Sequence, residues 1–365
     1  MSQAASAAAN GRVNLIGEHT DYNGGWVLPT AIPQKTRASV RPRADATVSC
    51  RTANGALAPA SFQLGEEKKT STWIDYVQGA AKFLAQSGRV LTGFDLQVDS
   101  DVPVGSGLSS SAALEVSLLK ALRAAFGLEL GDEELALLGR RIENEFVGAN
   151  VGIMDQMACA FASYGEALYL DAETLSFERV PLPLDRMDLI VLNSGLSHRN
   201  SDGGYNRRRE ECEAACRTLG VASLRALDAS ELARLDALPA VQARRARHVL
   251  TENRRVHEAA RALKDGDLER LGALFYASHA SMRDDYEISI PEIDLLVDLC
   301  RARPDVFGAR LTGGGFGGSI VAVARKGRGE DAARAVKADY EKRTGASATI
   351  LVPELSAGSR AAAGG

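Results

Sequence analysis

Apolar and polar residues follow two different periods along the chain, and these periods predict a mixture of strands and helices. Residues 94–99 alternate between apolar and polar side chains, which is typical of a half-buried strand. Three serines at 109–111 lead into apolar residues at helical spacing as far as Leu122, which predicts a helix whose start is capped by serine hydroxyls. A second helical pattern runs from Asp132 to Phe146 and stops at Gly148.

The later part of the chain continues this alternation in an irregular order. Pro291 is expected to open a helix, because the first helical position needs no backbone N–H donor. The other expected elements are a strand at 188–192, a polar loop to Gly204, helices at 206–219 and 241–263, and strands at 309–312 and 320–324 around a glycine turn. This order favours an α+β (mixed α/β) fold over a doubly wound parallel sheet. The first and last ten residues are predicted to be flexible tails.

Length and composition narrow the class of protein. A chain of 365 residues exceeds what one hydrophobic core usually organises, so two domains are expected. The net charge of −4 gives no electrostatic reason to expect nucleic acid or a membrane as partner, and no apolar run reaches the roughly 18 residues of a membrane span. The first residues lack the features of a secretory signal. The five cysteines are scattered, which predicts a reducing, cytoplasmic location and no zinc site.

The stretch GRVNLIGEHTDYNGG, residues 11–25, places several polar side chains directly after a strand-like segment. Glu18, His19, Asp21 and Tyr22 lie within five residues and precede a double glycine. A polar turn would explain them, and so would a site that binds a ligand with many hydroxyl groups.

The stretch VPVGSGLSSSAALEV, residues 102–116, has the composition of an anion site. A glycine-rich turn that runs into a helix exposes backbone N–H groups and the positive end of the helix dipole. Two glycines and three serines exceed what capping requires, so this segment predicts phosphate binding. It lacks the Gly-Lys-Ser/Thr of a Walker loop, so the phosphate would be bound without the usual lysine.

A second glycine cluster, in LTGGGFGGSIVAV (residues 311–323), matches the pattern GxGxxG at Gly313, Gly315 and Gly318. The dinucleotide-binding fingerprint requires a helix next, whereas residues 319–324 are strand-like. We therefore interpret the cluster as a glycine turn between two strands.

Two acids between these motifs are further candidates. Glu143 ends a helix, and Asp155 follows after two glycines with Ile153, Met154 and Met157 beside it. A carboxylate in such an apolar setting needs a partner. Taken by itself, Asp155 is better explained as a capping aspartate before a short helix at 156–162.

Together these segments resemble the three ordered motifs of the GHMP small-molecule kinases. More narrowly, GEHTDYN, GIMDQ, NSGLSHRNSDGGYNRRREEC, HASMRDDYEIS and TGGGFGG are similar to the galactokinases, over a stretch from Gly11 to about Val352. The resemblance implies two domains with the active site in the cleft between them. Residues 1–185 would carry the phosphate motif and the loop of residues 18–21, called the sugar loop below, and residues 186–365 would carry TGGGFGG.

Carried over residue by residue, the resemblance implies a site for D-galactose, ATP and Mg²⁺. Asp155 would take the proton from the anomeric hydroxyl, while Arg12 would keep Asp155 ionised and neutralise charge on the transferred phosphoryl group. The residues implied to bind the sugar are Glu18, His19, Thr20, Asp21 and Tyr205. Those implied to bind ATP are Gly105, Ser106, Gly107, Leu108, Ser109, Ser110 and Ser111. Those implied to hold magnesium are Ser111 and Glu143.

The resemblance also implies the products, galactose 1-phosphate and ADP, and a monomer without nucleic-acid or membrane partners. Asn10 departs from the family pattern, which has proline there and a longer leading segment. Two alternatives stay open: a related GHMP kinase acting on N-acetylgalactosamine or a pentose, and a non-enzymatic sensor of galactose and ATP. The intact serine-alanine helix start at 109–113 favours a kinase over a sensor.

Overall fold

The computed structural model describes residues 3–53, 58–196 and 201–353, and the chain divides into two compact units. The N-terminal unit comprises Met1–Arg12, Ala31–Val104 and Leu108–Ala162. The C-terminal unit comprises Val13–Thr30, Gly105–Gly107 and Ser163–Gly365. A mixed α/β fold was expected from the irregular order of strands and helices, and the structure confirms it.

The boundaries of these units differ from the predicted division at residue 185, because two early segments pack with later ones. Arg310 donates hydrogen bonds to the carbonyl oxygens of Asn14 and Leu15, which draws the sugar loop into the C-terminal unit. The Ser319 hydroxyl donates to the carbonyl oxygen of Ser106 over 2.6 Å, and this hydrogen bond draws residues 105–107 into the C-terminal unit. Both are long-range contacts that spacing along the chain does not reveal.

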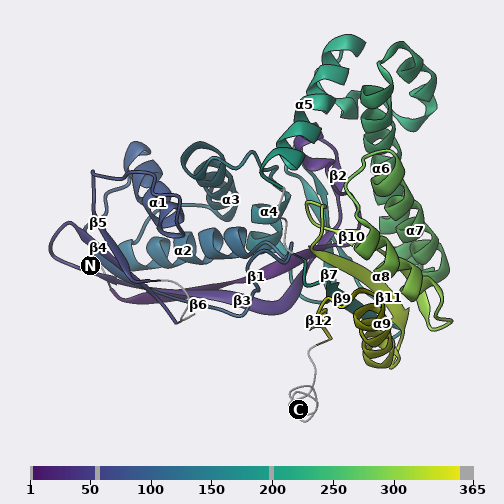
Figure 1. The fold of residues 1–365 in the computed structure, drawn as a ribbon. Coiled ribbons are helices and arrows are strands. Elements are labelled where there is room, and N and C mark those ends of the chain that lie inside the picture. Colours follow the sequence, from purple (N-terminus) through teal and green to yellow (C-terminus); the bar gives the residue numbers. More distant parts are fainter. Residues whose placement is uncertain (1–2, 54–57, 197–200, 354–365) are drawn as a thin grey trace. The chain divides into compact units, whose positions relative to one another are not determined.

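A mixed sheet covered by helices forms the N-terminal unit. Phe94, Leu96 and Val98 are buried in the sheet and alternate with more exposed residues, so the predicted alternation is confirmed. Helices α1, α2 and α3 lie over one face of the sheet (Figure 1). The strands of this unit are β3 (Pro29–Pro42), β4 (Thr47–Thr52), β5 (Ala60–Gln63) and β6 (Phe94–Ser100). The helices are α1 (Ile74–Gln86), α2 (Ser110–Phe126), α3 (Asp132–Arg141), the π-helical η2 (Ile142–Val147) and α4 (Met154–Phe161).

The first residues form a strand rather than the predicted flexible tail. Strand β1 (Ala5–Asn14) pairs with β3, and its side chains alternate between half-buried and exposed before becoming fully buried. The Asn10 amide donates to the carbonyl oxygen of Ile32 over 2.7 Å, so this side chain also ties β1 to β3. The prediction was wrong from Ala5 onward because pairing with β3 outweighs the low strand propensity of an alanine-rich segment. The predicted C-terminal tail lies outside the described residues.

A four-stranded antiparallel sheet in the order β10-β11-β9-β12 forms the core of the C-terminal unit. Strands β10 and β11 flank the glycine turn as predicted, and Leu311 and Ile320 are fully buried. Helices α7 (Leu268–Asp284) and α8 (Pro291–Arg301) pack against β10, and α9 (Gly329–Thr344) packs against β9. A Cβ at Gly272 would lie 2.0 Å from the carbonyl oxygen of Phe307, so glycine is what lets α7 approach β10 this closely. The strands are β9 (Met187–Asn193), β10 (Val306–Thr312), β11 (Ser319–Arg325) and β12 (Thr349–Val352).

The C-terminal unit also holds strands β2, β7 and β8, which belong to the same sheet as β3 because β7 pairs with β3 at Thr30. It further contains two helices that pack together, α5 and α6. Helix α5 begins at Ser201, so the polar loop expected to reach Gly204 is shorter than predicted. The three strands are β2 (Trp26–Val27), β7 (Glu166–Asp171) and β8 (Phe177–Pro181). The helices are α5 (Ser201–Leu219), α6 (Ala240–Asp265), α7 (Leu268–Asp284), α8 (Pro291–Arg301), α9 (Gly329–Thr344) and the short 3-10 turns η1 (Asp21–Asn23), η3 (Leu224–Ala226) and η4 (Ala229–Ala237). Across the described ranges, no helix combines the length and the apolar character needed to cross a membrane.

Candidate active site

In the N-terminal unit, Asp155 is held by two partners from distant parts of the chain. The Arg12 guanidinium donates to Asp155 Oδ1 from Nε over 2.8 Å and from Nη2 over 2.6 Å. The Ser109 hydroxyl donates to Asp155 Oδ2 over 2.5 Å. Arg12 is almost fully buried, whereas the Asp155 side chain remains 25% exposed. The carboxylate is therefore fixed in direction and still accessible to a reacting group.

The side chain of Ser109 hydrogen-bonds Asp155 instead of capping helix α2. It occupies the N-cap position, but its side chain makes no capping hydrogen bond, and its φ of 57° lies in the left-handed region. The prediction of a capped helix start is wrong at this residue, because the hydroxyl is turned toward Asp155. A non-glycine residue held in this conformation indicates that the surrounding contacts determine its position, as is common at active sites.

The predicted phosphate loop leads directly into α2, a helix of 17 residues. Gly105 and Gly107 both have positive φ, at 73° and 78°, which glycine adopts without strain. The Arg12 N–H donates to the carbonyl oxygen of Leu108 over 3.2 Å and ties the loop to β1. Ser110 and Ser111 form the first turn of α2 and are half-buried. The segment thus presents a helix N-terminus with hydroxyl groups, which suits an anionic ligand.

Glu143 lies in a buried carboxyl cluster in the same unit. Burial, followed by the nearby Asp155 charge, raises the pKa of Glu143 to about 7, although hydrogen bonds from Ser111 and Gln156 oppose this. Gln156 donates from one amide nitrogen to Glu143 Oε2 over 2.9 Å and to Glu115 Oε2 over 3.0 Å. Glu115 is fully buried, and burial followed by Glu143 raises its pKa.

This cluster has the chemistry of a hard-cation site. Carboxyl groups crowded in a buried setting are stabilised in their charged form when a cation lies beside them. In the described part of the chain, no group of three His, Cys, Asp or Glu side chains is arranged to hold a metal alone. Magnesium commonly uses one or two protein oxygens together with substrate phosphates, so Ser111 and Glu143 fit such an ion.

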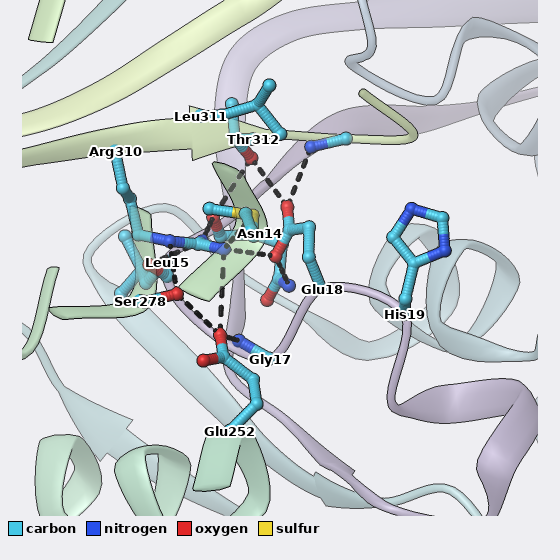
Figure 2. Close-up of polar contacts among 12 residues, drawn as sticks. Asn14, Leu15, Gly17, Glu18, His19, Glu252, Ser278, Arg310, Leu311 and Thr312 are labelled. Carbon is cyan, nitrogen blue, oxygen red and sulfur yellow. Dashed lines mark hydrogen bonds and ion pairs between the residues drawn. The ribbon is translucent and has the colours of Figure 1, made fainter. Parts of the chain in front are cut away.

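In the C-terminal unit, the Glu18 carboxylate lies at the centre of a buried hydrogen-bond network (Figure 2). Its Oε1 accepts from the Gly313 N–H over 2.7 Å and lies 3.1 Å from the Thr312 hydroxyl. Its Oε2 accepts from Arg310 Nη2 over 2.9 Å and from the side-chain amide of Asn14. Glu18 therefore joins the sugar loop to the glycine turn at the end of β10.

The neighbouring residues of the sugar loop are also fixed by internal contacts. His19 Nε2 lies 3.2 Å from the Gly314 carbonyl oxygen, which can only accept, so Nε2 carries the proton. Burial, followed by the His248 charge, lowers the pKa of His19 to about 3, so the ring is neutral and Nδ1 accepts from the Tyr22 hydroxyl over 2.7 Å. The Thr20 side chain is fully buried, and its hydroxyl donates to the Gly17 carbonyl oxygen over 2.8 Å. This hydrogen bond indicates that Thr20 holds the loop in its conformation.

Asp21 and Tyr205 are the half-buried members of the predicted sugar set. Asp21 begins the short turn η1, and Tyr205 belongs to α5. The Tyr205 ring centroid lies 4.9 Å from that of His19 and 5.3 Å from that of Tyr22. The structure therefore brings Tyr205 to the sugar loop, although almost two hundred residues separate them in the sequence.

Three residues that contribute to these arrangements were missed from the sequence: Gln156, Glu115 and Arg310. Arg310 carried the clearest signal, because a charge inside an apolar strand needs buried partners. Gln156 adjoins Asp155 in the GIMDQ motif, but its contacts with Glu115 and Glu143 depend on the packing of α2, α4 and η2.

Comparisons with known families place matches along most of the chain. The model of the galactokinase galactose-binding signature matches residues 2–42. The models of the GHMP kinases N-terminal domain and of the GHMP kinases C-terminal region match residues 75–163 and 259–342.

Individual proteins match over nearly their whole length. A galactokinase from Thermotoga neapolitana is 39% identical over 335 residues, which cover 92% of this chain and 93% of the relative. A galactokinase from Chloroflexus aurantiacus is 43% identical over 361 residues, covering 96% and 92%. The crystal structure of Lactococcus lactis galactokinase complexed with galactose matches with a TM-score of 0.92 and 36% identity, over 95% of this chain and 92% of that one. The mevalonate kinase of Methanococcus jannaschii, at 18% identity and a TM-score of 0.65 over 96% and 98%, shares the fold.

Proposed function

The chain belongs to the galactokinase family of the GHMP kinases and is a phosphotransferase with an alcohol group as acceptor, and from this premise we propose that it transfers the γ-phosphoryl group of ATP to the anomeric hydroxyl of D-galactose. The products are galactose 1-phosphate and ADP. The observation that carries the mechanism is the accessible Asp155 carboxylate, held by Arg12 and Ser109 beside the start of α2.

Asp155 acts in this proposal as the base toward the anomeric hydroxyl. A general base must be held within hydrogen-bond reach of the proton that it removes, and its direction must be fixed. Arg12 and Ser109 supply that orientation from two sides. Arg12 also places positive charge where negative charge develops on the transferred phosphoryl group, which lowers the barrier to transfer.

The segment Gly105–Ser111 binds the ATP phosphates in this proposal. The positive end of the α2 dipole and the backbone N–H groups of the loop favour the triphosphate, and the serine hydroxyls add donors. Magnesium, when bound, neutralises charge on the phosphate oxygens, and Ser111 and Glu143 are the residues that would hold it.

The loop of residues 18–21, together with Tyr205, forms the sugar site in this proposal. Asp21 and Tyr205 hydrogen-bond the sugar hydroxyls, while internal contacts hold Glu18, His19 and Thr20 in the conformation that forms the site. A site built to hydrogen-bond a hydroxyl rejects a sugar that misplaces it, because buried polar groups are then left unpaired. Galactose and glucose differ in the direction of one hydroxyl, so the two should differ by about 10³-fold in kcat/KM.

An assay of ADP release with several free sugars tests this function. The panel contains D-galactose, D-glucose, N-acetylgalactosamine and a pentose, and phosphorus-coupled proton spectra locate the phosphate on the product. We expect turnover of galactose with phosphate on the anomeric oxygen, and almost none of glucose. Faster turnover of N-acetylgalactosamine or the pentose would assign another sugar substrate. Binding of galactose and ATP without ADP release would indicate a sensor.

A further inference from the structure

A fully buried arginine, Arg310, lies in β10 three residues before Gly313, the first glycine of the TGGGFGG turn. Its neighbours in the strand, Ala309 and Leu311, are also fully buried. Burying a guanidinium is costly unless partners satisfy its charge and its donors. The partners of Arg310 therefore show what the residue does.

All three guanidinium nitrogens of Arg310 are hydrogen-bonded, and most of their partners lie directly before the sugar loop or within it (Figure 2). Nη1 donates to the carbonyl oxygens of Asn14 and Leu15 over 3.2 and 2.9 Å. Nη2 donates to Glu18 Oε2 over 2.9 Å, and Nε donates to the Ser278 hydroxyl over 3.1 Å. One planar side chain thus holds the backbone before the loop and the first acidic residue within it.

A second buried carboxylate, Glu252 on α6, completes this arrangement. Its Oε1 lies 3.7 Å from Arg310 Nη2 and accepts from the Gly17 N–H over 3.0 Å and from the Ser278 hydroxyl over 2.6 Å. Its Oε2 accepts from Arg255 Nε over 2.6 Å. Two carboxylates, Glu18 and Glu252, are therefore balanced by two guanidinium groups, Arg310 and Arg255.

The sugar loop is consequently fixed on both sides of Gly17. Arg310 holds the carbonyl groups before it, Glu252 holds its N–H group, and Arg310 holds the Glu18 side chain after it. Glu18 in turn accepts from the N–H of Gly313 in the glycine turn. No contact with a substrate is needed for Arg310 to control the conformation of the loop.

We propose that Arg310 is a positioning residue for sugar binding, acting through Glu18 and the backbone of residues 14–17. The proposal rests on the proposed function, because it assigns the loop after Gly17 to galactose. A guanidinium is required since a lysine ammonium cannot present donors in three directions of one plane. A misplaced loop should weaken galactose binding more than ATP binding, because Arg310 hydrogen-bonds Asn14, Leu15 and Glu18 before and within that loop.

The test is Arg310→Lys, which keeps the buried charge and removes the planar fork. We expect the KM for galactose to rise about 10- to 100-fold, while the KM for ATP and kcat change far less. Galactose affinity measured by calorimetry should fall by a similar factor.

Arg245→Lys is the matched control. Arg245 is also a buried arginine of the C-terminal unit with two carboxylate partners, Glu211 at 2.7 Å and Glu287 at 2.5 Å. Its remaining N–H group donates to the Asp285 carbonyl oxygen, so its hydrogen bonds join α6 to α5 and to the residues after α7. This variant should lose stability and keep its KM for galactose. Equal effects of the two substitutions on galactose, or equal effects of Arg310→Lys on galactose and ATP, would overturn the positioning role.

Thr312→Val is the milder variant that decides the question if Arg310→Lys does not fold. It removes the hydroxyl that lies 3.1 Å from Glu18 Oε1 and 3.0 Å from the Asn14 carbonyl oxygen, at nearly constant volume. A selective rise in the KM for galactose supports the proposal, and an unchanged KM contradicts it. Parent protein that binds galactose without turnover would contradict the proposed function instead, and the affinities of the variants would still test Arg310.

Discussion

Asp155→Asn isolates the chemical role of the carboxylate, because the surrounding hydrogen bonds can adapt to it. With its amide oxygen toward Arg12, the asparagine still accepts from the guanidinium that now donates over 2.6 and 2.8 Å. Its amide nitrogen then faces the Ser109 hydroxyl, which can accept a hydrogen bond instead of donating one. The side chain therefore keeps its place and loses its charge and its basicity.

The expected loss of turnover follows from the two roles that the charge serves. Removing a general base typically costs about 10²- to 10⁴-fold in kcat, or about 3–5 kcal/mol in the barrier. Arg12, whose side chain is only 5% exposed, also loses the charge of its partner, so we expect stability to fall by about 1–3 kcal/mol. Galactose affinity should change little, because asparagine keeps the shape of the side chain and can still hydrogen-bond the anomeric hydroxyl.

Steady-state kinetics with galactose and ATP, together with calorimetric titration of galactose, measure these effects. Asp132→Asn is the control, since it neutralises another Asp–Arg pair of the same unit, with Arg123 at 2.7 Å, away from the proposed site. The control should keep its turnover. If Asp155→Asn retains kcat within about tenfold of the parent, Asp155 does not act as a general base and the reasoning fails.

Three further predictions concern the metal, the sugar and the response to pH. Glu143→Gln should raise the magnesium concentration needed for half-maximal activity far more than the KM for galactose. If parent and variant reach half-maximal activity at the same magnesium concentration, Glu143 is not a magnesium ligand. Asp21→Ala should weaken galactose binding about tenfold or more and leave ATP binding unchanged, since a hydrogen bond to a charged group is worth about 1.5–3 kcal/mol; calorimetry that finds equal galactose affinity would contradict its role. Burial lowers the pKa of His248 from 6.5 to about 4, so the folded state binds fewer protons than the unfolded chain below pH 6.5. His248 should therefore lower the free energy of unfolding by about 2 kcal/mol between pH 7 and pH 5. Urea unfolding of His248→Asn at both pH values should show a decrease that is smaller by about this amount.

Much of the local structure could be predicted from the sequence, because it depends on residues that are close together along the chain. The alternation at 94–99 identified β6, and the strand-like residues after Gly318 excluded a dinucleotide-binding turn. The long glycine- and serine-rich motifs identified the family, which the comparisons confirm. The roles that the resemblance implied for individual side chains stay predictions.

Contacts between distant segments could not be predicted in the same way. The first residues of β1 resemble a tail in the sequence, but β3 supplies their hydrogen bonds. Ser109 resembles a helix cap, but its hydroxyl donates a hydrogen bond to Asp155. Local spacing and composition determine which residues can form strands, helices and glycine turns. Only the tertiary structure decides that Arg310 reaches Glu18, because a buried charge is stabilised by whichever groups the fold brings to it.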